Sequence, residues 1–431
     1  MSAALGYAIS RESLMAVVLV GVFLATVVFT LAGLARFTAM VLATLPWLVM
    51  LNTLIPKMTL TFVSTAGALL LLSLTRPRYT PSSLAWIGTS LFSLILLIGV
   101  IESEAGEQFI EAAKYLVLPV MVLVVTSRSG REHLINMRWV LLWSGVGAMA
   151  AQGAIVLLHL GKSSTKYGAG EQLGFATQNP HELALVGVIV AVACLVGIRD
   201  IRWRLIGAVI AVAPALATGV RSALVGISIS LVVLAIRARF RPSVLLGIAA
   251  LCAAIIFSGV GTIIATRYQQ DQVKGEFSHV ATLGSDRGAL WTVALHQWSA
   301  SGPTGLVFGS GLRSIKQIEA QGLFLPNATA QSDPITILVE LGILGLIGWL
   351  LIWLALVSSG VNWLLLLPLA SYAVTNGSLE YVGATVFGIA LAGACMSAKQ
   401  QDTGVELSRQ ANNARVYQGR PRTPYAVPHH P

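Results

Sequence analysis

Residues 334–357 read PITILVELGILGLIGWLLIWLALV. This apolar run holds one charged residue, Glu340, and is longer than the about 20 residues that a helix needs to cross a membrane. Similar runs recur along the 431-residue chain, which is 55% hydrophobic and only 11% charged, whereas soluble domains are about 25% charged. A soluble enzyme, a disordered chain and a collagen-like fibre are therefore excluded, and an all-α polytopic membrane protein is predicted.

Thirteen apolar runs are candidate membrane helices. If 38–55 and 58–74 both cross, the protein has 13 helices and its amino terminus lies outside. If one of them is re-entrant, or the two form one broken element, it has 12 helices and the amino terminus lies inside. The other runs are 14–34, 84–101, 109–126, 139–160, 182–198, 205–217, 223–236, 243–264, 334–357, 361–375 and 381–397.

The same pattern predicts four parts. Residues 1–264 hold membrane helices one to about ten, and 265–333 form a large extracytoplasmic loop with short helices. Residues 334–398 hold the C-terminal membrane helices. The polar, proline-containing stretch 399–431 is predicted to be a disordered cytoplasmic tail.

Arginines concentrate in every second connection between the apolar runs. The connections between them are acidic, mixed or very short, and this alternation places the arginine-rich connections in the cytoplasm. It also accounts for the net charge of +10 without a nucleic-acid partner. The arginine-rich connections contain Arg76 and Arg78; Arg128, Arg131 and Arg138; Arg199, Arg202 and Arg204; and Arg237, Arg239 and Arg241.

Two arginines are expected on the outer side. Arg221 lies in the tight turn between two short apolar runs, where it either extends to lipid headgroups or forms a fixed cation for a phosphate-bearing lipid. Arg287 precedes the stretch 288–298, whose spacing of apolar residues predicts a helix with two tryptophans on the membrane interface. An arginine beside a helix start can bind an anion, or it can simply be solvated.

Other motifs are less informative. Asn179 and His181 flank Pro180 at the predicted start of an outer-side helix, where either could cap it. The glycine-rich stretch 301–311 predicts a loop. No phosphate-binding loop, nucleophile elbow or zinc-binding motif is present, and the three cysteines have no metal-binding spacing, so neither a metal nor a cofactor is expected.

Several elements, in sequence order, resemble the O-antigen ligase and O-antigen polymerase superfamily of bacterial envelope glycan assembly. The resemblance covers roughly residues 80–395. The elements are FATQNPHELA at 175–184, ATGVRSAL at 217–224, Ser285–Arg287 with Leu290 and Trp291, Gly309–Gly311, and ILVELGILG at 337–345.

The resemblance implies a multi-pass protein of the bacterial plasma membrane. It implies transfer of a glycan from undecaprenyl pyrophosphate to an acceptor hydroxyl at the outer leaflet, without a metal or nucleotide sugar. Arg221 and Arg287 would hold the pyrophosphate, and Asn179 and His181 are possible substrate contacts. The partners would be a lipid-linked glycan donor, a glycan or lipid acceptor, and membrane lipid. Ligase and polymerase remain alternatives, since both use this donor.

The sequence departs from the family at one catalytic position. The family has a histidine where this chain has Gln331, followed by Ser332 and Asp333. Asp333 is the first candidate for the missing base, although with Pro334 next to it Asp333 could instead cap a helix. The other candidates are His181, His279 and His296. A transporter or flippase of lipid-linked glycans, and a non-catalytic envelope assembly partner, are the alternative functions.

Overall fold

A computed structural model describes part of the chain in detail. The run at 243–264, nearly all of 14–34, Asn179, Gln331 and the tail from residue 399 lie outside the described residues. The described residues are 33–50, 57–75, 81–102, 108–158, 162–164, 172–175, 180–218, 220–237, 287–315 and 332–395.

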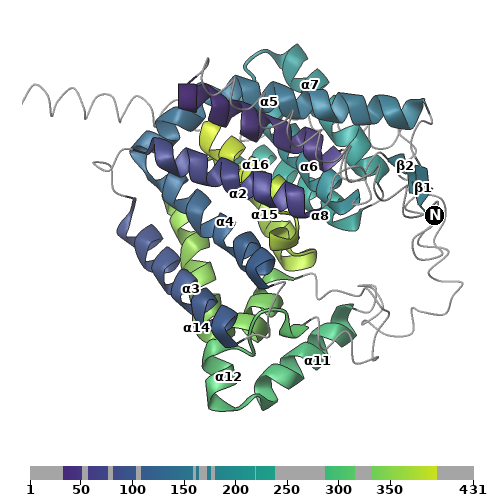
Figure 1. Cartoon of the computed structure of the whole chain (residues 1–431). Helices are drawn as coiled ribbons and strands as arrows, with labels where there is room; N and C mark the ends of the chain where they lie inside the picture. The colour runs from purple at the N-terminus through teal and green to yellow at the C-terminus, as the bar shows by residue number, and fades with distance from the viewer. Residues whose placement is uncertain are drawn as a thin grey trace, which may run out of the picture. The chain divides into compact units, whose positions relative to one another are not determined.

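The described chain is mostly helical (Figure 1). Five of its helices are long and apolar enough to cross a membrane, and shorter apolar helices accompany them. The prediction of an all-α polytopic membrane protein is therefore confirmed. The helices are Gly33–Met50, α2 (Lys57–Leu74), α3 (Ser83–Glu102), α4 (Gln108–Thr126), α5 (Arg128–Leu157), α6 (Pro180–Gly197), α7 (Ile201–Ala217), α8 (Arg221–Arg237), α11 (Arg287–Ala300), α12 (Gly302–Phe308), α14 (Asp333–Ser358), α15 (Trp363–Thr375), the 3₁₀ turn η3 (Ser378–Glu380) and α16 (Val382–Ala394).

Two local predictions were wrong, and one connection contains strands for which the sequence analysis made no prediction. The arginines at 128–138 lie in helix α5 rather than in a connection, because Ser127 caps this helix by accepting a hydrogen bond from the Gly130 N–H. The stretch 301–311, predicted as a loop, contains helix α12 with Pro303 in its first turn. The connection before α6 contains a short antiparallel pair of strands, β1 (Lys162–Ser164) and β2 (Gln172–Phe175).

Helix α6 lies in the core. Every residue from Glu182 to Leu195 is buried, as expected for a helix that is apolar on all sides. It packs against α5, α7, α8, α15 and α16. A methyl group at Gly187 would lie 2.6 Å from the Cβ atom of Ala215, so this glycine permits the close approach of α6 and α7.

The helix ends form two groups. We call the first group the arginine-rich end of the helices. There the Arg131 guanidinium donates a hydrogen bond to the Ser359 carbonyl, and the Asn362 amide donates one to the Cys395 carbonyl. The second, which we call the polar end, holds the amino ends of α4, α6, α8, α14 and α16 and the carboxyl end of α15. The described parts of two arginine-rich connections meet at this end, since Arg138 and Arg199 line one groove. The cytoplasmic location of these connections remains a prediction from the sequence.

Candidate functional site

A set of polar side chains, most of them buried or half-buried, occupies the polar end. Its centre is the connection between α15 and α16, residues 376–381, with the sequence Asn-Gly-Ser-Leu-Glu-Tyr. Four residues of this connection each meet a different helix. The pairs are Asn376 with Ser222 of α8, Ser378 with Asp333 of α14, Glu380 with Lys114 of α4, and Tyr381 with His181 of α6.

Asp333 is held firmly by this connection. The backbone N–H and the hydroxyl of Ser378 donate to its Oδ2 atom at 2.9 and 2.5 Å, and the Leu379 N–H donates to Oδ1 at 3.2 Å. The side chain is only 2% exposed. The carboxylate therefore fixes η3 to the start of α14.

His181 lies at the start of α6, next to the start of α8. Its imidazole is stacked on Tyr381 with the ring centroids 6.3 Å apart, and its Nδ1 atom lies 3.4 Å from the Asn376 side-chain nitrogen. The same Asn376 nitrogen donates to the hydroxyl of Ser222, the residue after Arg221. One amide group therefore links the imidazole to the helix start that carries Arg221.

The two predicted anion-binding arginines both begin helices. Arg221 is the first residue of α8, and Arg287 is the first residue of α11. Thr218 folds the turn before Arg221, since its hydroxyl donates to the Ala215 carbonyl and accepts from the Val220 N–H. The structure describes only the backbone of the two arginines.

The predicted tryptophan helix is present as α11. Ala294 of this helix packs with Ile315 and with Val339 of α14 in a small buried cluster. Trp291 and Trp298 pack against the same cluster. The helix that Arg287 begins is therefore attached to α14, which begins at Asp333.

A pair of glycines joins the end of α12 to α14. Gly309 has φ 88° and Gly342 has φ 67°, and at Gly342 the helix α14 is kinked. The kink leaves the Val339 carbonyl free to accept a hydrogen bond from the Ser310 N–H at 2.9 Å. We call the close contact between Gly309 and Gly342 the glycine lock. It connects the segment after α11 to the third turn of α14.

Glu340, whose carbonyl lies against Gly309, belongs to a network of charged residues. Glu340 is 2% exposed and accepts a hydrogen bond from the Tyr115 hydroxyl of α4 at 2.8 Å. The Lys114 ammonium pairs with Glu111 at 3.0 Å and with Glu380 at 3.7 Å. The sequence singled out Glu340, but it missed this network and the 376–381 connection. The sequence feature that could have indicated the 376–381 connection is a short polar stretch between two apolar runs.

The fold and the site together define a polytopic membrane protein with a polar site at one end of its helices. A family model described as O-Antigen ligase matches residues 206–350, from α7 to α14. The match supports the assignment of the chain to the O-antigen ligase and polymerase superfamily, as the sequence motifs predicted. A comparison with curated proteins gives no match.

Proposed function

We propose that the protein transfers a glycan from undecaprenyl pyrophosphate to an acceptor hydroxyl at the outer leaflet of the bacterial plasma membrane. One observation carries this proposal. The segment that matches the O-Antigen ligase family contains Arg221, Arg287 and Asp333, and the connection 376–381 contacts both the start of α8 and the start of α14. The helix starts that carry Arg221 and Asp333 thus contact the same connection, which supports a shared role for them.

The proposed reaction needs a cation site and a base. A base takes the proton of the acceptor hydroxyl while its oxygen attacks the anomeric carbon, and the bond between the sugar and the pyrophosphate breaks. Arg221 and Arg287 would stabilise the charge that develops on the departing pyrophosphate, because a guanidinium can bind two phosphate oxygens at once.

His181 is the better candidate for the base. Both oxygens of Asp333 already accept hydrogen bonds from Ser378 and Leu379, whereas His181 lies half-buried beside the helix start of Arg221. An imidazole also has an ordinary pKa near neutral pH, which suits a general base. In this account Asp333 is a positioning residue, and Gln331 and Ser332 take no part in proton transfer.

Substitutions separate the two candidates. His181→Phe keeps a ring against Tyr381 but removes both nitrogen atoms, so transfer per folded protein should fall about 100- to 10,000-fold. Asp333→Asn replaces an acceptor oxygen by a donor beside Ser378, so it should lower the melting temperature while the protein that remains folded keeps its activity. Glycan transfer and thermal unfolding are measured on the same purified samples.

One further variant completes this test. Gln331→His restores the family residue and should leave transfer unchanged if His181 already serves as the base. A folded but inactive Asp333→Asn protein, together with an active His181→Phe protein, would show that Asp333 is the base and that our choice of His181 is wrong.

A further inference from the structure

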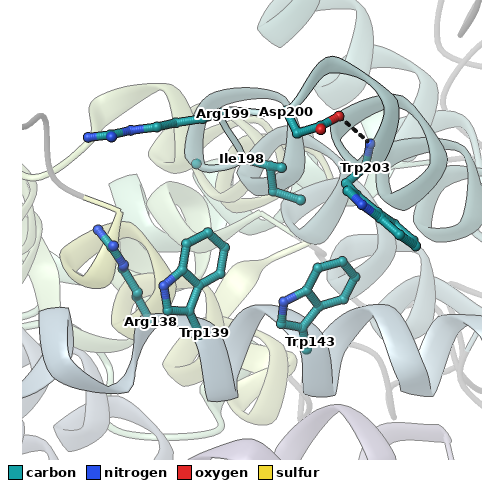
Figure 2. Close-up of a pocket in the computed structure, with 8 residues that line it drawn as sticks. Arg138, Trp139, Trp143, Ile198, Arg199, Asp200 and Trp203 are labelled. Atoms are coloured by element: carbon teal, nitrogen blue, oxygen red, sulfur yellow. Dashed lines mark hydrogen bonds between the residues drawn. The ribbon is translucent and has the colours of Figure 1, made fainter.

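A groove opens at the arginine-rich end, far from the polar site. It lies between α5 and the connection from α6 to α7 and has a volume of about 640 Å³ (Figure 2). Helix α6 has His181 near its start and Gly197 at its end, which separates the groove from the polar site by about 25 Å. The lining residues are Arg138, Trp139, Trp143, Gly197, Ile198, Arg199, Asp200 and Trp203.

The groove carries two exposed cations. Figure 2 shows Arg138 and Arg199 extending toward the same end of it, and neither forms an ion pair with a residue in the described part of the chain. Asp200 contributes the opposing charge, but its carboxylate accepts from the backbone N–H groups of Arg202 and Trp203 and so caps α7. An excess of positive charge therefore remains in the groove.

Three tryptophans form the apolar part of the groove. Trp143 and Trp203 meet edge to face with their ring centroids 6.3 Å apart, and both residues are exposed, as is Trp139. The Arg138 guanidinium lies 4.9 Å from the centre of the Trp139 ring. Exposed tryptophans beside arginines are typical of the level where a helix leaves the hydrocarbon of a membrane.

The apolar lengths of α5 and α6 place the groove at the level where these helices leave the hydrocarbon of the membrane. Helix α5 has 30 residues, or about 45 Å, which exceeds the about 30 Å of hydrocarbon. Its polar first turns, with Arg128 and Arg131, end at Trp139, where the apolar residues begin. The apolar residues of α6 end at Gly197, on the opposite wall of the groove.

We propose that this groove binds an anionic phospholipid from the leaflet at the arginine-rich end. Its phosphate would lie between Arg138 and Arg199, and its glycerol and upper acyl chain along Trp143 and Trp203. The charges are complementary, since guanidinium groups bind phosphate oxygens in pairs. Basic pockets between membrane helices are suited to anionic lipid headgroups. This site is independent of the proposed transfer reaction.

Lipid titration of the full-length protein in detergent, followed by native mass spectrometry, tests the proposal. Phosphatidylglycerol should bind at concentrations at least about 10-fold lower than phosphatidylcholine. The double variant Arg138→Ala with Arg199→Ala should weaken phosphatidylglycerol binding about 10- to 150-fold, as expected for loss of charge-assisted contacts. Equal binding of the two lipids to the unaltered protein would overturn the proposal.

Two controls sharpen the experiment. Arg128→Ala with Arg202→Ala removes two exposed arginines of the same region that do not line the groove, and this variant should bind lipid as the unaltered protein does. Trp143→Ala with Trp203→Ala should weaken binding, because a lipid needs the apolar wall and a free phosphate ion does not. Equal losses in the two arginine variants, or full binding by the tryptophan variant, would contradict the assignment.

Discussion

Alanine at Arg221 or Arg287 is expected to lower glycan transfer by about 10- to 150-fold each, the effect of losing a charge-assisted contact of about 1.5–3 kcal/mol. The reason is that each arginine would neutralise charge on the pyrophosphate as it departs. Lysine should restore activity poorly, because an ammonium group cannot bind two oxygens in the fixed geometry of a guanidinium. The length and amount of glycan in cells measure the effect.

Helix α8 offers a matched control for this prediction. It begins with Arg221 and ends with Arg237, whose guanidinium lies over the Trp363 ring at the opposite end of the helix. Arg237→Ala should therefore leave glycan transfer near its normal level. Normal glycans from both Arg221→Ala and Arg287→Ala, at normal protein amounts, would show that these arginines do not hold the donor.

Alanine at either residue of the glycine lock is expected to prevent formation of stable protein. A methyl group at Gly342 would lie 2.3 Å from the Val307 carbonyl oxygen, and one at Gly309 would lie 2.3 Å from the Glu340 carbonyl. These neighbours are backbone atoms, which cannot rotate away. The backbone conformation at both positions is also one that essentially only glycine adopts, at a cost of about 1–3 kcal/mol for other residues.

Gly302 provides the control for the glycine lock. It also has a positive φ, 78°, but a methyl group there would meet no atom within 4 Å. Gly302→Ala should therefore lower the melting temperature only moderately, while Gly342→Ala and Gly309→Ala should give little monodisperse protein in size-exclusion chromatography. The account of the lock is contradicted if Gly342→Ala unfolds at the same temperature as Gly302→Ala.

The sequence predicted most of the helices because membrane helices must be long and apolar. The predicted runs at 58–74, 84–101 and 109–126 agree with α2, α3 and α4 to within a residue or so at each end. The start of α5 was missed because its first turns carry arginines, which hydropathy assigns to a connection. Helix formation there depends on the Ser127 cap rather than on apolar periodicity.

The contacts of the site could be predicted only in part. The start of α8 at Arg221 and of α6 near His181 followed from the turn before each helix. The role of Asn376 in joining them could not be predicted, because the residues are far apart in the sequence and meet only after the helices pack. Gly309 and Gly342 were singled out by resemblance, but their contact with each other is likewise tertiary.

Transfer by the purified protein in liposomes tests the central claim most directly. The liposomes contain a glycan on undecaprenyl pyrophosphate and an acceptor glycan, with a chelator and no nucleotide sugar. We expect a new glycosidic product and release of undecaprenyl pyrophosphate, with Arg237→Ala active and Arg221→Ala impaired. Movement of the lipid-linked glycan between leaflets with no glycosidic product would contradict it and identify a flippase.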